Sequence, residues 1–115
     1  MDGREPRVRR RTIDRAELKR KLDAGERLKL VMALGGFGFR AKRIPGSLGF
    51  DSPEEALAEL EPEDEIVVYC AGESCAASVY AQRLLESRGY RNVRRYAGGI
   101  ADWEAAGLPL EGELA

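Results

Sequence analysis

Two cysteines, Cys70 and Cys75, are the residues of this sequence whose type and spacing best suit covalent chemistry. An apolar, β-branched run at residues 66–69 leads into Cys70 and predicts a buried strand. A helical pattern follows and continues to about Arg88, so both cysteines lie in the tight loop between them. Such a loop directs unpaired backbone N–H groups and the positive end of the helix dipole at one point. Because a thiolate is an anion, Cys70 is predicted to be a nucleophile.

The alternative interpretation is that the cysteines are small buried hydrophobic residues, which is the commoner role of a free cysteine. The strand–cysteine–loop–helix arrangement favours the reactive interpretation for Cys70, and favours it less strongly for Cys75. The sequence contains no histidine, which excludes Cys–His and Ser–His–Asp mechanisms and most metal sites. A C-x4-C pair is no disulfide framework and lacks the further ligands of a zinc site. We therefore expect neither a metal nor a cofactor.

Length and composition indicate one globular domain. The chain has 115 residues, of which 43% are hydrophobic and 34% charged. Its apolar runs are too short to span a membrane, and its polar, Arg-rich N-terminus has no apolar signal segment. We therefore expect a cytoplasmic, reducing location and no membrane partner.

The net charge of −1 conceals an asymmetry. Residues 1–43 carry 14 Lys or Arg and 6 Asp or Glu, whereas residues 51–115 carry 5 and 14. A basic half could contact nucleic acid, but mutual neutralisation within one small domain is the favoured interpretation. No aromatic residues interleave the local basic cluster as stacking platforms, which also argues against nucleic acid. That cluster consists of Arg4, Arg7, Arg9, Arg10 and Arg11.

Helical and strand patterns alternate along the chain, which predicts an α/β fold with a mainly parallel sheet. In such sheets, sites lie at the carboxyl ends of strands, where Cys70 is placed. The loops after Ala33 and Tyr96 should flank it. Strands are predicted at about residues 28–33, 48–50, 66–69 and 93–96. Helices are predicted at about residues 15–24, 53–60 and 100–106, and another follows the cysteine loop and ends near Arg88.

Local signals support several of these boundaries. Asp14 and Glu17 resemble a capping box, and the run from Ser52 to Glu55 provides an N-cap serine, a proline and a glutamate at the third position. The glycine-rich stretch from Gly35 to Arg40 predicts a loop with unusual backbone freedom or close approach to another segment. Its two phenylalanines, Phe37 and Phe39, could form a lip over a pocket or insert into the core.

Three segments together resemble the single-domain rhodanese family. Ile44-Pro45-Gly46-Ser47 resembles its I-P-G-A turn, and Val67-Val68-Tyr69-Cys70 resembles its strand and nucleophile. The closing signature is matched by Gly89-Tyr90-Arg91-Asn92-Val93, then Gly98-Gly99-Ile100-Ala101-Asp102-Trp103, then Ala106-Gly107-Leu108-Pro109. The combination is specific, although each piece alone is weak.

The resemblance covers roughly residues 12–111 and implies an about five-stranded, mainly parallel sheet with helices on both faces. It divides the chain into a flexible basic arm at residues 1–11 and a rhodanese-like domain at 12–115. It also implies sulfur transfer: the cysteine takes a sulfane sulfur from a donor such as thiosulfate or polysulfide and passes it to a thiophilic acceptor, such as a protein thiol. Carried over by position, Cys70 is the nucleophile, and the substrate-binding loop consists of Ala71, Gly72, Glu73, Ser74 and Ala76, with Cys75 as a second thiol.

The sequence departs from the family pattern in this loop. The family often has C-x-x-G-x-R-S, whereas here Glu73 replaces the glycine, Cys75 the arginine and Ala76 the serine. An acidic rim and a missing cation argue against thiosulfate as the substrate. The family's aspartate and histidine fall at Met32 and Arg43, positions that are largely structural in the family.

Related phosphatases of this fold need a loop one residue longer that ends in arginine, so phosphate-ester hydrolysis is not favoured. Two alternatives to sulfur transfer stay open. Some relatives carry a Y-C…C-x-A-S loop like this one, so Cys70 and Cys75 could form a dithiol redox or sulfur-relay pair, provided that their Cα atoms lie within about 7 Å. The other alternative is a non-catalytic rhodanese-fold binding module.

Overall fold

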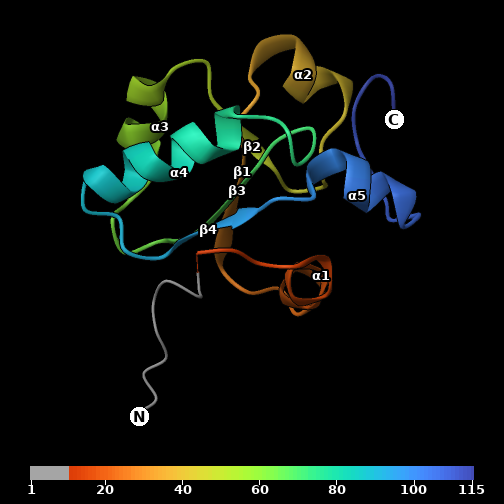
Figure 1. The fold of residues 1–115 in the computed structure, drawn as a ribbon, viewed down its shortest axis with the longest axis horizontal. Coiled ribbons are helices and arrows are strands. Elements are labelled where there is room, and N and C mark those ends of the chain that lie inside the picture. Colours follow the sequence, from red (N-terminus) through yellow and green to blue (C-terminus); the bar gives the residue numbers. More distant parts are fainter. Residues whose placement is uncertain (1–10) are drawn as a thin grey trace.

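The computed structural model describes residues 11–115. Its centre is a four-stranded parallel sheet in the order β2-β1-β3-β4. The central strand β3 therefore lies between β1 and β4, and Figure 1 shows helices above and below this sheet. The strands are β1 Leu28–Met32, β2 Leu48–Gly49, β3 Glu65–Tyr69 and β4 Val93–Tyr96.

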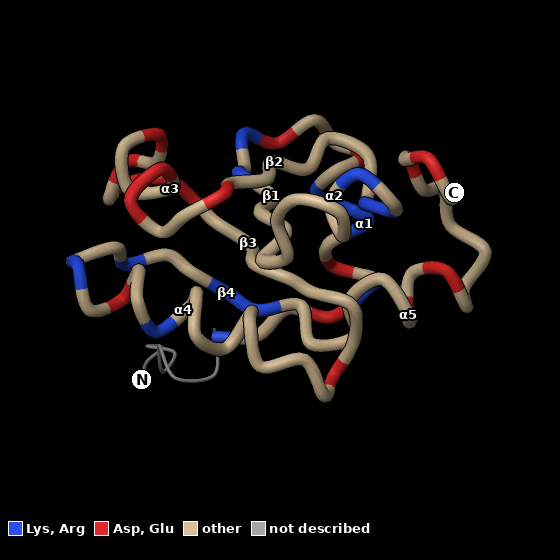
Figure 2. The backbone as a smooth tube through the Cα atoms, turned by 90° about the horizontal axis from the view of Figure 1, so that it is seen from above, with Lys and Arg blue, Asp and Glu red and all other residues tan. Residues whose placement is uncertain are grey.

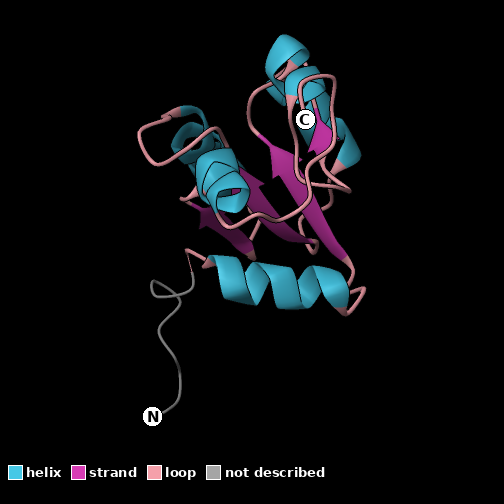
Figure 3. Ribbon diagram, turned by 90° about the vertical axis from the view of Figure 1, so that its right-hand side faces the viewer, coloured by secondary structure: helices cyan, strands magenta, loops and turns pink. Residues whose placement is uncertain are grey.

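The helices cover both faces of the sheet, as predicted. Figure 3 shows α1 on one face and the pair α3 and α4 on the other. This arrangement follows from the connections, because right-handed crossovers that move across the sheet in the same direction lie on the same face. The connections from β2 to β3 and from β3 to β4 move in the same direction, so α3 and α4 lie together. The helices are α1 Arg15–Asp23, α2 Gly36–Ala41, α3 Pro53–Glu59, α4 Ala77–Ser87 and α5 Gly99–Ala105.

Alternation along the strands divides the interior into two hydrophobic clusters. Val67 and Tyr69 of β3 face the cluster that contains Trp103 of α5, whereas Ile66 and Val68 face the cluster beneath α3 and α4. These four side chains of β3 are fully buried. A strand that is covered on both faces has a continuous run of apolar residues. This run was the signal that predicted β3 from the sequence.

The predicted helix starts are confirmed. The Asp14 side chain accepts a hydrogen bond from the Glu17 backbone N–H at 2.8 Å. At α3, the Ser52 hydroxyl accepts from the Glu55 N–H at 3.1 Å, and the Glu55 carboxylate accepts from the Asp51 N–H at 2.7 Å. These bonds satisfy N–H groups that have no partner within the helix.

Two predictions about elements need correction. Within residues 11–115 the sheet has four strands rather than about five, because the described segment before α1 meets β4 through a single bridge, Thr12 to Arg95. The predicted flexible arm at residues 1–11 lies outside the described part except for Arg11, whose carbonyl accepts from the Arg95 N–H at 2.7 Å. The glycine-rich stretch forms the short helix α2 rather than a loop, although the predicted close approach is present: a Cβ on Gly35 would lie 2.6 Å from the Phe50 carbonyl oxygen.

The two phenylalanines of α2 differ. Phe39 packs against the cluster on the α5 side, whereas Phe37 is 67% exposed. Only one of them therefore inserts into the core, and the other is free to contact a ligand or another molecule.

The charge asymmetry is offset inside the domain, as the sequence suggested. Within residues 11–115, several basic residues of the first half pair with acidic residues of the second. Figure 2 shows the acidic cover of α3 and the basic positions of β4. Among residues 11–115, no helix is long and apolar enough to cross a membrane. The pairs between the halves are Arg11–Glu86, Arg15–Asp102, Lys21–Glu65, Lys29–Asp64, Lys42–Glu104 and Arg43–Glu111.

Candidate functional site

Cys70 lies directly after β3, at the carboxyl end of the sheet, and is 1% exposed. The preceding residue fixes its position, because the Tyr69 hydroxyl accepts a hydrogen bond from the Ile44 N–H at 2.9 Å and also bonds the Ser47 hydroxyl. Burial raises the pKa of Tyr69, so the hydroxyl stays protonated. The turn at residues 44–47 thus anchors the strand end that presents Cys70.

The two cysteines are brought together and joined Sγ to Sγ in a disulfide. Their Cα atoms are 6.2 Å apart, within the range that a disulfide requires. Between them, the Cys75 N–H donates to the Gly72 carbonyl at 3.2 Å and closes a tight turn. The sequence placed both thiols in one loop and left a dithiol pair open, and the distance condition stated for that pair is met.

The loop between the cysteines presents backbone N–H groups, as the sequence predicted. Helix α4 starts at Ala77 with Ala76 as its N-cap, and no side chain caps it. Among residues 11–115, the N–H groups of Glu73, Ser74, Ala76 and Ala77 donate no hydrogen bond to the protein. They are therefore free to stabilise an anion held within the loop.

The start of α5 holds the other side of the loop. The Ile100 N–H donates to the Cys70 carbonyl at 3.0 Å, and the Ala101 N–H donates to the Ala71 carbonyl at 2.8 Å. Gly99 has a φ of +60°, and a Cβ there would collide with the Cys70 carbonyl oxygen. The flanking role predicted for the loop after Tyr96 is confirmed, and this contact explains why that loop carries glycine.

Arg95 of β4 is a site residue that the sequence reasoning missed. Its guanidinium donates to the Ser78 hydroxyl at 2.8 Å and to the Glu73 carbonyl at 3.2 Å. A cation from a neighbouring strand therefore lies against the loop that lacks its own arginine. Strand alternation was the available signal, because it places Arg95 on the same face of β4 as Val93, beneath α4.

The comparisons with known proteins agree with this geometry. The family description "Rhodanese-like domain" matches residues 14–106. The chain belongs to the rhodanese-like family. The resemblance stated from the motifs is thus confirmed over most of the chain.

Solved structures share the rhodanese-like fold. The chain matches the rhodanese-like domain of Alr3790 from Anabaena with a TM-score of 0.80 and 30% identity, covering 90% of this chain and 80% of that one. A thiosulfate sulfurtransferase from Pseudomonas aeruginosa matches with a TM-score of 0.73 and 25% identity, covering 91% of this chain and 21% of that one.

One curated relative places this rhodanese-like region inside a larger protein. An HTH-type transcriptional regulator from Mycobacterium tuberculosis is 39% identical over 101 residues. The match covers 86% of this chain, which spans only 44% of the length of that relative.

Met32 and Arg43, the two departures from the rhodanese-like pattern outside the Cys70 loop, contribute to packing and to local contacts. Met32 is a buried core residue, 3% exposed. Arg43 donates to the Phe39 carbonyl at 3.1 Å, pairs with Glu111 at 3.4 Å and lies over the Phe39 ring. Within residues 11–115, neither side chain forms a hydrogen bond or ion pair with the Cys70 loop.

A cavity of about 490 Å³ opens beside the site, between α3 and α4. Residues after β1, including Ala33 and Gly36, line one end of it, and Ala77 and Tyr80 of α4 line another part. Neither cysteine lines it, so this hollow adjoins the Cys70 loop without containing it. Among the described residues, no cluster of three or more metal-ligating side chains is present.

Proposed function

We propose that this rhodanese-like domain accepts a sulfane sulfur on Cys70 and passes it to a thiol acceptor. The Cys70 thiolate attacks the sulfane sulfur of a donor such as thiosulfate or a polysulfide. The donor's S–S bond breaks, its electron pair leaves with sulfite or the shortened polysulfide, and Cys70 becomes a persulfide. An acceptor thiolate then attacks the outer sulfur, takes it as a new persulfide and restores the Cys70 thiolate.

The observation that carries this proposal is the position of Cys70 at a strand end, beside the free N–H groups of Glu73, Ser74, Ala76 and Ala77. Those donors would stabilise the persulfide anion, as oxyanion-type sites stabilise developing charge. The partners in this proposal are therefore a small sulfur donor and a thiol, which a protein can provide.

The charge of the loop disfavours thiosulfate as the sulfur donor. The Glu73 side chain is exposed at the rim, where it repels a dianion such as thiosulfate. Arg95 offsets part of this charge, but its N–H groups already donate to Ser78 and Glu73. We therefore expect thiosulfate to load Cys70 slowly.

A second candidate function is sulfur or redox sensing within a regulator. It is supported by the relative that is named a transcriptional regulator and contains a matching region. In this reading the persulfide or disulfide state of the loop is recognised by another domain or protein rather than turned over rapidly.

Intact mass spectrometry tests the main proposal. The reduced wild-type protein, Cys70→Ser and Cys75→Ser are incubated with thiosulfate or with a polysulfide, and the excess donor is removed. We expect Cys75→Ser to gain one sulfur atom and Cys70→Ser to gain none. Failure of Cys75→Ser to load from any sulfane donor would overturn sulfur acceptance and leave the sensing or binding alternatives.

A further inference from the structure

We propose that Cys75 resolves the persulfide of Cys70, so that the domain reduces sulfane sulfur to hydrosulfide and stores the oxidation as a disulfide. This inference rests on the proposed function, since it begins from the Cys70 persulfide. The Cys75 thiolate attacks the Sγ of Cys70. The bond between that Sγ and the outer sulfur breaks, hydrosulfide leaves with the electron pair, and the Cys70–Cys75 disulfide forms.

The placement of the two sulfurs indicates which atom Cys75 attacks. The structure bonds the Cys75 Sγ to the Cys70 Sγ itself, with the Cα atoms 6.2 Å apart. Attack on this inner sulfur forms the disulfide and expels hydrosulfide, whereas attack on the outer sulfur would only move the persulfide to Cys75. The observed pairing therefore favours release over relay.

The loop keeps the thiols close without the disulfide. Two hydrogen bonds from α5 reach the carbonyls of Cys70 and Ala71, and Arg95 holds the Glu73 carbonyl at 3.2 Å. None of these contacts involves a cysteine sulfur, so reduction leaves them intact. Resolution by Cys75 is then an intramolecular step with a high effective concentration, and it competes well with an external acceptor.

The difference in exposure between the cysteines sets the direction of recycling. Cys70 is 1% exposed, whereas Cys75 is half-buried. A small thiol reductant therefore reaches the Cys75 sulfur first, and Cys70 leaves as a thiolate beside the N–H groups of the loop. A second reductant thiol frees Cys75, so each cycle consumes two thiols and yields one hydrosulfide and one external disulfide.

The test follows sulfur through one turnover in reduced wild type and Cys75→Ser, with Cys70→Ser as the control for unspecific reaction. Each protein is treated with one equivalent of polysulfide in the absence of any thiol. Hydrosulfide is measured with a fluorescent trap, and free protein thiols are alkylated before intact mass spectrometry. Because loading from a polysulfide can itself release sulfide, the decisive quantity is the excess over Cys75→Ser.

We expect the wild type to release about one further equivalent of hydrosulfide and to end as a disulfide that resists alkylation. Cys75→Ser should keep its added sulfur at least ten times longer, until a thiol is supplied. If Cys75→Ser loads and the wild type retains its persulfide equally long, resolution by Cys75 is wrong while sulfur acceptance stands. If Cys75→Ser never loads, the proposed function itself fails.

Discussion

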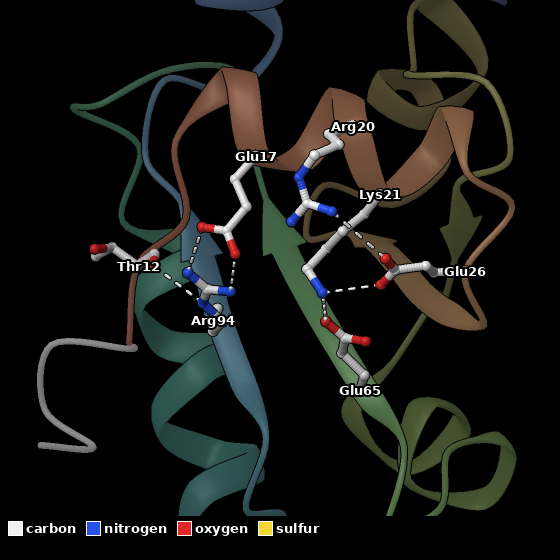
Figure 4. A network of polar contacts seen from close by, with 7 residues as sticks. All are labelled: Thr12, Glu17, Arg20, Lys21, Glu26, Glu65 and Arg94. Carbon is white, nitrogen blue, oxygen red and sulfur yellow. Dashed lines mark hydrogen bonds and ion pairs between the residues drawn. The ribbon is translucent and has the colours of Figure 1, made fainter. Parts of the chain in front are cut away.

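The α1 side of the sheet and the Cys70 loop are held in place by different kinds of interaction. On the α1 side, charged side chains connect the layers: Arg94 makes a bidentate pair with Glu17, and Lys21 pairs with Glu65 and Glu26 (Figure 4). At the loop, backbone groups from α5 make most of the contacts. One region is held by side chains that can be replaced singly, and the other by main chain.

The consecutive arginines of β4 show this contrast within two residues. Arg94 points toward α1, where it donates to Glu17 and to the Thr12 carbonyl, and it is 9% exposed. Arg95 points to the opposite face and contacts Ser78 and the Glu73 carbonyl. We infer that Arg94 serves stability and Arg95 serves the loop, and substitutions can separate these roles.

The largest effect is expected for Gly99→Ala. The residue has a φ of +60°, and its new Cβ would collide with the Cys70 carbonyl oxygen. We expect a loss of about 2–4 kcal/mol in the free energy of unfolding, together with slower sulfur loading. The matched control is Gly25→Ala, where φ is +71° but nothing lies within 4 Å. Gly25→Ala should lower the free energy of unfolding by about 1–2 kcal/mol and leave sulfur loading unchanged. Equal losses for the two variants in urea unfolding would contradict the role assigned to Gly99.

The next effect is expected for Arg94→Met. Loss of the guanidinium removes the pair with Glu17 and the bond to the Thr12 carbonyl at 3.0 Å. Because Glu17 is itself 36% exposed, we expect a moderate loss of about 1–2 kcal/mol. Urea unfolding measures this loss, while the sulfur-loading rate at Cys70 should stay within twofold. If Arg94→Met slowed sulfur loading but left the free energy of unfolding unchanged, the assignment of Arg94 to stability would be wrong.

Arg95→Met should give the complementary result. It removes the donor to Ser78 and to the Glu73 carbonyl, so the loop loses a fixed contact and a nearby cation. We expect the loading rate with polysulfide to fall about three- to tenfold, with a change in stability of about 1 kcal/mol or less. Stopped-flow loading of Cys75→Ser, with and without Arg95→Met, measures this effect. An unchanged rate would show that the loop needs no side-chain support.

The smallest effect is expected for Glu17→Gln, and it depends on pH. Hydrogen bonding to Arg94 lowers the pKa of Glu17 below its ordinary value of 4.5. The carboxylate therefore stabilises the fold fully above pH 4.5, and this contribution is lost as the pH falls through the lowered pKa of the folded state. We expect the wild type to exceed Glu17→Gln by about 1 kcal/mol or less at pH 7.

The measurement is urea unfolding as a function of pH. The difference between wild type and Glu17→Gln should shrink as the pH falls below 4.5. Glu63→Gln removes an exposed carboxyl group that has no ion pair with any residue in 11–115, and it provides the matched control. A difference that persists unchanged in acid would show that Glu17 acts through packing rather than charge.

The sequence predicted most of the fold because its signals were local. The apolar run before Cys70 and the caps at Asp14 and Ser52 each appear where expected. The helix at Gly36–Ala41 was missed because its glycines disfavour a helix, and packing of Phe39 against the core outweighs that preference.

The Cys70 loop was located from the sequence, but the contacts that support it were not. Cys70 and Cys75 could be placed from the strand–loop–helix pattern, and the closing signature from the family resemblance. The Arg95 contact and the collision that only a glycine at position 99 avoids depend on how β4 and α5 pack against the loop, and such distances are not encoded locally. The disulfide likewise required the loop's three-dimensional path.

The most direct test of the central claim is to locate the added sulfur by fragmentation mass spectrometry of Cys75→Ser after brief exposure to polysulfide, with Cys70→Ser treated in parallel. We expect the extra sulfur on Cys70 in the first variant and no stable addition in the second. Sulfur found on Cys75 in the Cys70→Ser protein, with none on Cys70 in the Cys75→Ser protein, would contradict the assignment of Cys70 as the nucleophile.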